Sequence, residues 1–107
     1  MNRFYLFSKK SCGPCALVDK YFKGVKDDRI SQVQKIDLED AGPLPIPEEN
    51  LRLAKFYEVT ATPVLVITDK DGRPLDTKVG GMAITQNIRS LLEEYGTEKE
   101  TSDQATA

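Results

Sequence analysis

The sequence predicts a single α/β domain in which strands and helices follow in the order βαβαββα. Two observations carry this prediction. Short runs rich in aromatic and β-branched residues alternate with segments whose apolar residues recur at helical spacing. The length of 107 residues suits one domain with a modest core. We assign this domain to residues 1–96 and expect residues 97–107, which carry no large apolar side chain, to form a disordered tail.

Four segments have the composition of strands. Residues 3–8 are aromatic and apolar, which indicates a buried strand, and residues 31–38 indicate a second one. Residues 63–68 form a β-branched run. The sequence Asp-Lys-Asp-Gly at residues 69–72 then supplies the turn chemistry of a hairpin that returns antiparallel through residues 75–79. The third and fourth strands are therefore expected to pair.

Three segments show helical spacing. Apolar residues that follow the cysteines fall on one helical face, and Pro14 suits the first turn because a missing N–H costs nothing there. An acidic, proline-rich stretch at residues 39–47 predicts a loop, and residues 48–57 predict a short second helix after it. The last helix is expected at residues 84–95, whose apolar residues recur at spacings of about three and four.

Charge and composition exclude several classes of partner. The chain has 15 Lys and Arg against 17 Asp and Glu, a formal charge of -2, and no basic stripe, so nucleic acid is not an expected partner. No run approaches the roughly 20 apolar residues that span a bilayer, and no apolar signal core follows the N-terminus. We expect a cytoplasmic monomer with no membrane partner, no bound metal and no cofactor.

The only two cysteines lie in the tetrapeptide Cys12-Gly13-Pro14-Cys15, between the first strand and the first helix. A disulfide across so short a loop constrains little unfolded-chain entropy, so a purely structural bridge gains little. In a reducing cytosol, catalytic or metal use fits such a pair better. A zinc site would need carboxylates or a second chain because the sequence has no histidine, and burial as two small apolar side chains is the remaining alternative.

The position of the two cysteines suits thiol–disulfide exchange. With the helix beginning near Gly13, Cys12 lies at its N-terminus, where backbone N–H groups and the helix dipole stabilise a thiolate. Lys9 and Lys10 add positive charge nearby. Cys15 falls in the first turn, close enough to attack a mixed disulfide formed on Cys12. The pattern therefore predicts that Cys12 attacks and Cys15 resolves.

Three motifs together resemble the thioredoxin family over residues 3–95: Cys12-Gly13-Pro14-Cys15, Ala61-Thr62-Pro63 at the start of a strand, and Val79-Gly80-Gly81 before the last helix. The resemblance implies a thioredoxin-like fold with a central four-stranded mixed sheet flanked by helices. The N-terminal strand and helix of full-length thioredoxins are not expected, because the predicted order begins at the strand before the motif. The implied activity is reduction of protein disulfides by the Cys12/Cys15 dithiol, which a thioredoxin reductase-like donor reduces again.

The resemblance also implies a substrate-binding surface. Pro63 corresponds to a cis proline that faces the disulfide, and Thr62 would offer its backbone to an extended peptide. The glycines before the last helix suit unusual backbone angles or close approach by a substrate. The predicted substrate-binding residues are Gly13, Pro14, Thr62, Pro63, Gly80 and Gly81.

The sequence departs from the thioredoxin pattern at two positions. Ser11 stands where the family usually has Trp, which alters the docking surface. Leu6 stands where the family usually has a buried Asp that helps the second cysteine lose its proton. Without that base, burial would raise the pKa of the Cys15 thiol and slow resolution, unless water or Lys35 assists. A faster Leu6→Asp variant would support this expectation.

Two alternatives stay open. The glycine pair and the short predicted architecture are similar to glutaredoxins, which use glutathione, although residues 82–85 lack the acidic residue that meets the glutathione amine in that family. The domain could instead be a binding subunit of a larger assembly, with incidental redox activity. The intact cysteine pair disfavours the second alternative, because a scaffold does not need both thiols.

Overall fold

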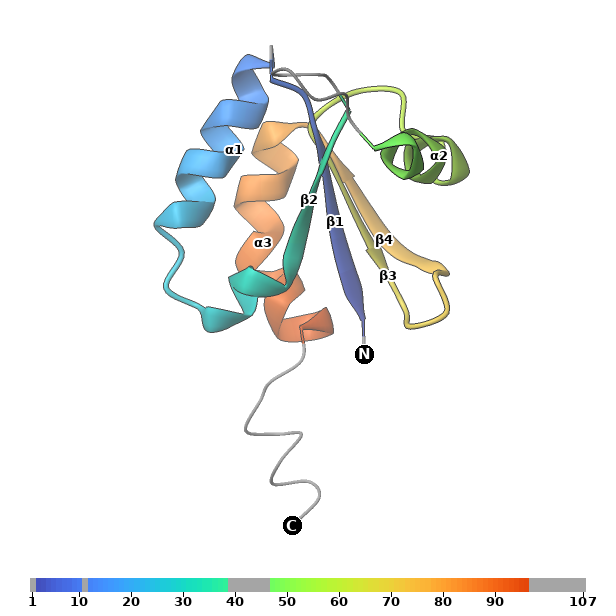
Figure 1. The fold of residues 1–107 in the computed structure, drawn as a ribbon. Helices are drawn as coiled ribbons and strands as arrows, with labels where there is room; N and C mark the ends of the chain where they lie inside the picture. Colours follow the sequence, from blue (N-terminus) through green and yellow to red (C-terminus); the bar gives the residue numbers. More distant parts are fainter. Residues whose placement is uncertain (1, 11, 39–46, 97–107) are drawn as a thin grey trace.

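The computed structural model describes residues 2–10, 12–38 and 47–96. Ser11, nearly all of the predicted loop and the predicted tail lie outside these residues. In chain order the elements are β1 (Arg3–Ser8), α1 (Gly13–Lys23), the 3₁₀ helix η1 (Asp28–Gln32), β2 (Val33–Asp37), α2 (Glu48–Phe56), β3 (Val64–Thr68), β4 (Pro74–Val79) and α3 (Gly81–Tyr95). Figure 1 shows α1 and α3 on one face of the sheet and α2 on the other.

The sheet is mixed and has the strand order β2-β1-β3-β4. β1 runs parallel to β2 and antiparallel to β3, and β3 runs antiparallel to β4. The parallel pair is joined by a crossover through α1, whereas the hairpin β3–β4 needs only a tight turn. All five residues of β3 are buried, as expected of a central strand covered on both faces. The predicted four-stranded mixed sheet flanked by helices is confirmed.

Alternation along β1 divides the core into two clusters. Phe4 and Leu6 point to the face covered by α1 and α3, and Tyr5 and Phe7 point to the face covered by α2. The first cluster is the larger one, and its fully buried members include residues of both helices. They are Val18, Leu65, Ile67, Ile84, Ile88 and Leu92.

Two boundaries differ from the sequence prediction by more than one residue. The second strand begins at Val33, because η1 occupies the residues before it. The carboxylate of Asp27 caps this turn by accepting from the Arg29 backbone N–H at 3.0 Å, and it also pairs with the Arg29 guanidinium at 2.7 Å. Such local hydrogen bonds from a side chain to the backbone favour a turn over strand pairing in a β-sheet. The last helix begins three residues earlier than predicted, at Gly81.

The packing of the larger core cluster predicts how a shortened side chain changes the free energy of unfolding. Ile88 is 0% exposed on α3, so Ile88→Ala should lower the free energy of unfolding by about 2–5 kcal/mol through lost burial and a cavity. Urea titration followed by circular dichroism measures this loss. The matched control is Leu17→Ala on α1, where the side chain is 67% exposed and the change should stay within about 0.5 kcal/mol. Equal losses in the two variants would contradict this packing.

Candidate redox site

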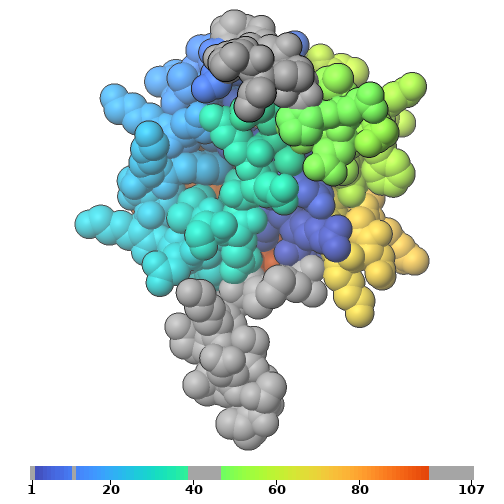
Figure 2. All heavy atoms as spheres, in the orientation of Figure 1, coloured from blue at the N-terminus to red at the C-terminus, as the bar shows by residue number. Residues whose placement is uncertain are grey.

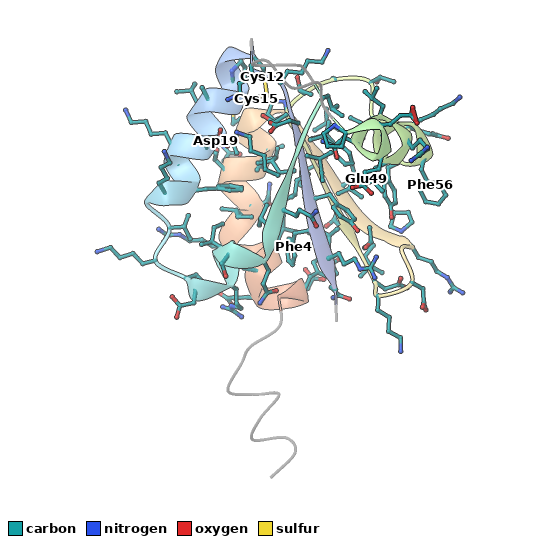
Figure 3. The ribbon with its side chains drawn as sticks, viewed as in Figure 1. Phe4, Cys12, Cys15, Asp19, Glu49 and Phe56 are labelled. Atoms are coloured by element: carbon teal, nitrogen blue, oxygen red, sulfur yellow. A yellow bond between two sulfur atoms is a disulfide. The ribbon has the colours of Figure 1, made fainter. Side chains whose placement is uncertain are left out.

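Cys12 and Cys15 form a disulfide at the N-terminus of α1, with Cα atoms 5.2 Å apart. Cys12 is the N-cap residue, and its Sγ accepts a hydrogen bond from the Cys15 backbone N–H at 3.1 Å. Pro14 lies in the first turn, as predicted. Figure 3 shows both sulfurs at this end of the helix, with Asp19 one turn further along.

The two sulfurs lie in different environments. Cys12 is half-buried, and Gly13 and Pro14 beside it are exposed, so a partner can reach its sulfur. Cys15 is 2% exposed and packs inward. The first turn of α1 contains no acidic side chain, and the Cys15 N–H at the helix N-terminus points at Cys12 Sγ, which favours a negative charge on that sulfur. This geometry suits one accessible attacking thiol and one shielded resolving thiol.

The Thr62–Pro63 segment, just before β3, lies beside this disulfide. The Thr62–Pro63 peptide bond is cis, as the family resemblance implies, and Pro63 is fully buried. The Thr62 carbonyl oxygen lies 3.7 Å from Cys12 Sγ, although the two residues are 50 positions apart in the chain. The structure therefore brings the cysteine motif and the proline motif together.

The glycine pair takes two different roles. Gly80 has φ +96° and ψ 151°, a region that residues with a Cβ rarely adopt, and its N–H donates to the Pro63 carbonyl at 2.9 Å. Gly81 is instead the first residue of α3, so the expectation of unusual backbone angles is wrong there. A Cβ on Gly81 would lie 3.6 Å from Pro14 and Val18, which is ordinary contact distance. The two glycines thus hold the start of α3 against the Thr62–Pro63 segment and against α1.

The structure accounts for Leu6 and Lys35 as follows. Leu6 is 2% exposed within the larger core cluster and offers no proton acceptor. Lys35 Nζ lies 2.7 Å from Asp19 Oδ2, in a pair of which each side chain is more than a third exposed. Asp19 was not among the residues predicted from the sequence, although its spacing of four from Cys15 places both side chains on one face of α1. Neither was Asp37, two positions after Lys35 on the same face of β2.

A hollow of about 550 Å³ lies beside residues 58–62, between this segment and α2. Its wall combines apolar and polar residues from α2 and from the segments next to β1, β2 and β3. The apolar ones are Leu38, Leu51, Ala54, Val59 and Ala61, and the polar ones are Lys9, Lys55, Glu58, Thr60 and Thr62. An extended chain that bonds to the Thr62 backbone would have this hollow beside it.

Comparisons with known proteins identify the fold. No family model and no curated protein matches the sequence. Among solved structures, the thioredoxin of Malassezia sympodialis superposes with a TM-score of 0.65 at 19% identity, covering 90% of this chain and 76% of the other. A mutant thioredoxin from Halobacterium salinarum gives 0.63 at 26% identity, covering 91% and 76%. A thioredoxin-fold protein from Helicobacter pylori gives 0.61 at 21% identity, covering 92% and 75%.

This chain has the thioredoxin fold. Its structural relatives are thioredoxins, and its close cysteine pair is consistent with their Cys-x-x-Cys motif. It covers about three quarters of the length of each of these three structures. In the part of this thioredoxin-fold chain that the structure describes, no helix has the length and apolar character needed to cross a bilayer.

Two glycines beside the site give a matched pair of variants. A Cβ added at Gly13 or Gly80 meets no atom within 4 Å, so only the backbone angle distinguishes the two positions. Gly80→Ala should cost about 1–3 kcal/mol, because alanine is strained at φ +96°. Gly13→Ala should be neutral or stabilise by up to about 1 kcal/mol. Thermal unfolding of both variants measures the difference, and equal effects would show that the Gly80 conformation is not required.

Proposed function

We propose that this protein is a thiol–disulfide oxidoreductase that reduces protein disulfides through Cys12 and Cys15. The observation that supports this most is the Cys12–Cys15 disulfide at the N-terminus of α1, with the Thr62 carbonyl of the cis Thr62–Pro63 bond 3.7 Å from Cys12 Sγ. The fold shared with thioredoxins supports the same activity. We further propose that the protein acts as a monomer in the cytoplasm, where a reductase keeps the pair reduced.

In the first step the Cys12 thiolate attacks one sulfur of a substrate disulfide. The helix N-terminus stabilises a thiolate at this position through its N–H groups and its dipole. The bond from the Cys15 N–H to Cys12 Sγ is one such contact. One substrate sulfur becomes bonded to Cys12, and the other leaves as a thiolate.

Backbone contacts would hold the substrate during this attack. An extended peptide can add to the Thr62 backbone as an antiparallel partner, and its side chains would then lie near the hollow beside α2. Gly13 and Pro14 leave the approach to Cys12 open because both carry little side-chain bulk. Gly80 contributes by holding the Pro63 carbonyl in place.

In the second step Cys15 attacks Cys12, and the bond between Cys12 and the substrate breaks. The substrate leaves with both of its sulfurs reduced, and the protein retains the Cys12–Cys15 disulfide. Two electrons have moved from the dithiol to the substrate. A reductase of the thioredoxin reductase type would return them.

Turnover with two electron donors tests this proposal. A model protein disulfide should be reduced rapidly with NADPH and a thioredoxin reductase, and at a rate at least about tenfold lower with glutathione and its reductase. The reason is that residues 81–85 carry no acidic side chain to meet the glutathione amine. NADPH oxidation measures both rates.

The matched controls are Cys12→Ser and Cys15→Ser, which should abolish turnover in the thioredoxin reductase system. Turnover only in the glutathione system would assign the protein to the glutaredoxin class. Full biological activity of a Cys12→Ser/Cys15→Ser protein would favour the binding subunit.

The Cys15→Ser variant should trap substrates. Without the resolving thiol, no second cysteine can attack the mixed disulfide on Cys12. Covalent complexes should therefore accumulate, and dithiothreitol should release them. Non-reducing gel electrophoresis followed by mass spectrometry identifies the partners. The Cys12→Ser variant should trap at least about tenfold less, since Cys15 is 2% exposed. Equal trapping by the two variants would contradict the assigned roles.

A further inference from the structure

A small cavity of about 160 Å³ lies beside the disulfide. Both cysteines line it together with charged residues from β2, α1 and the segment after β1. These charged residues are Lys9, Lys10, Asp19, Lys35 and Asp37. Figure 2 shows β2, in teal, at the front of the molecule between α1 and α2. Lys35 and Asp37 of this edge strand form one wall of the cavity.

Asp37 is the last residue of β2 and lies opposite Ser8 in the parallel pairing with β1. Lys35, two positions earlier, lies opposite Leu6. Because side chains alternate along a strand, Asp37 projects to the same face as Leu6, the face that α1 covers. Lys35 and Asp37 of β2 therefore line the same cavity as Cys15.

The Asp37 carboxylate has an oxygen without a hydrogen-bond donor. Its Oδ1 is sealed from solvent and has no partner within the described residues. Buried carboxylate oxygens normally accept at least one hydrogen bond, so an exception calls for a physical reason. Asp19, the other carboxylate of the cavity, differs because its Oδ2 accepts from Lys35 Nζ at 2.7 Å.

The redox state of Cys15 supplies a reason. In the disulfide form described here Cys15 carries no S–H, whereas in the dithiol form it gains a donor beside the same cavity. We propose that Asp37 is the proton acceptor of the Cys15 thiol in the resolving step. It would provide from β2 the carboxylate that Leu6 does not provide from β1. This inference rests on the proposed disulfide reductase function.

The proposed step conserves atoms and electrons. The Asp37 carboxylate takes the proton of the Cys15 thiol, directly or through water, for which a cavity of this size has room. The Cys15 thiolate bonds to Cys12 Sγ while the bond from Cys12 to the substrate breaks. The substrate leaves as a thiolate, and the proton on Asp37 passes to it or to solvent. No further oxidant or reductant is needed.

This assignment revises the expectation drawn from Leu6. If Asp37 accepts the proton, resolution is not slow in this protein, and Leu6→Asp brings no gain while Asp37 is present. The same substitution should restore part of the rate in an Asp37→Asn background, because it returns a carboxylate to the same face of the sheet.

A single rapid-mixing experiment separates the two steps. The fully reduced protein is mixed with an excess of a chromogenic nitrobenzoate disulfide. The first release of nitrobenzoate thiolate reports attack by Cys12, and the second reports attack by Cys15. At pH 7, Asp37→Asn should slow the second release at least about tenfold and leave the first within about twofold, since a lost general base typically costs a factor of about 10² or more and cavity water replaces part of it.

Asp19→Asn is the matched control, because it removes the other carboxylate of the cavity and should change the rate of the second release less than about threefold.

The pH dependence gives a second test. At about pH 10 an ordinary thiol ionises without help, so the second-release rates of wild type and Asp37→Asn should converge. The pH dependence of the wild-type second release adds a measurement that does not depend on any variant folding. With a built-in acceptor it should change less than about threefold between pH 6 and pH 8, whereas an unassisted thiol speeds up about tenfold per pH unit.

The outcomes are distinguishable. Equal second releases in wild type and Asp37→Asn, or a wild-type second release that climbs tenfold per pH unit, would overturn the role of Asp37 and leave the proposed function intact. Slowing in Asp19→Asn alone would assign proton transfer to the Asp19–Lys35 pair instead. Absence of a rapid first release in the wild type would count against the proposed function itself.

Discussion

The antiparallel register between β1 and β3 is the constraint on which the site depends. Phe7 pairs with Val64, so the end of β1 and the start of β3 lie side by side at one edge of the sheet. The chain leaves β1 toward Cys12 and enters β3 from Pro63. The Thr62 carbonyl therefore lies 3.7 Å from Cys12 Sγ. A shift of one residue would move every side chain of β3 to the opposite face and separate the two motifs.

The helix N-terminus and the core then give the two cysteines unequal environments. Cys12 caps α1 and remains accessible, whereas Cys15 is held against the interior. Thiol–disulfide exchange needs this inequality, because one sulfur must meet a partner and the other must wait until the mixed disulfide has formed. The packing of α1 against α3, in which Gly81 lies close to Pro14, keeps the helix start in position.

The edge strand adds a second consequence of sheet topology. β2 pairs with β1 in parallel, which places Lys35 and Asp37 beside α1 rather than on the α2 face. The proton acceptor that thioredoxins usually carry on the strand before the motif is absent at Leu6, yet the neighbouring strand brings the Asp37 carboxylate into the cavity that Cys15 lines. A sheet can thus provide one chemical group from either of two adjacent strands, because side chains at paired positions share a face.

The sequence by itself determined the element order, the helix start at the cysteines and the resemblance to thioredoxins, because helical and strand spacing and the Cys-Gly-Pro-Cys motif are local properties. Only the tertiary structure decided that Asp19 and Asp37 share a cavity with Cys15, since these two residues lie on different elements and their spacing along the chain does not show that the elements meet there. The resemblance implied a cis Thr62–Pro63 bond, and the structure contains it. Local spacing carries no information on which distant segments pack together, and in this chain the pairing of strands far apart in sequence supplies it.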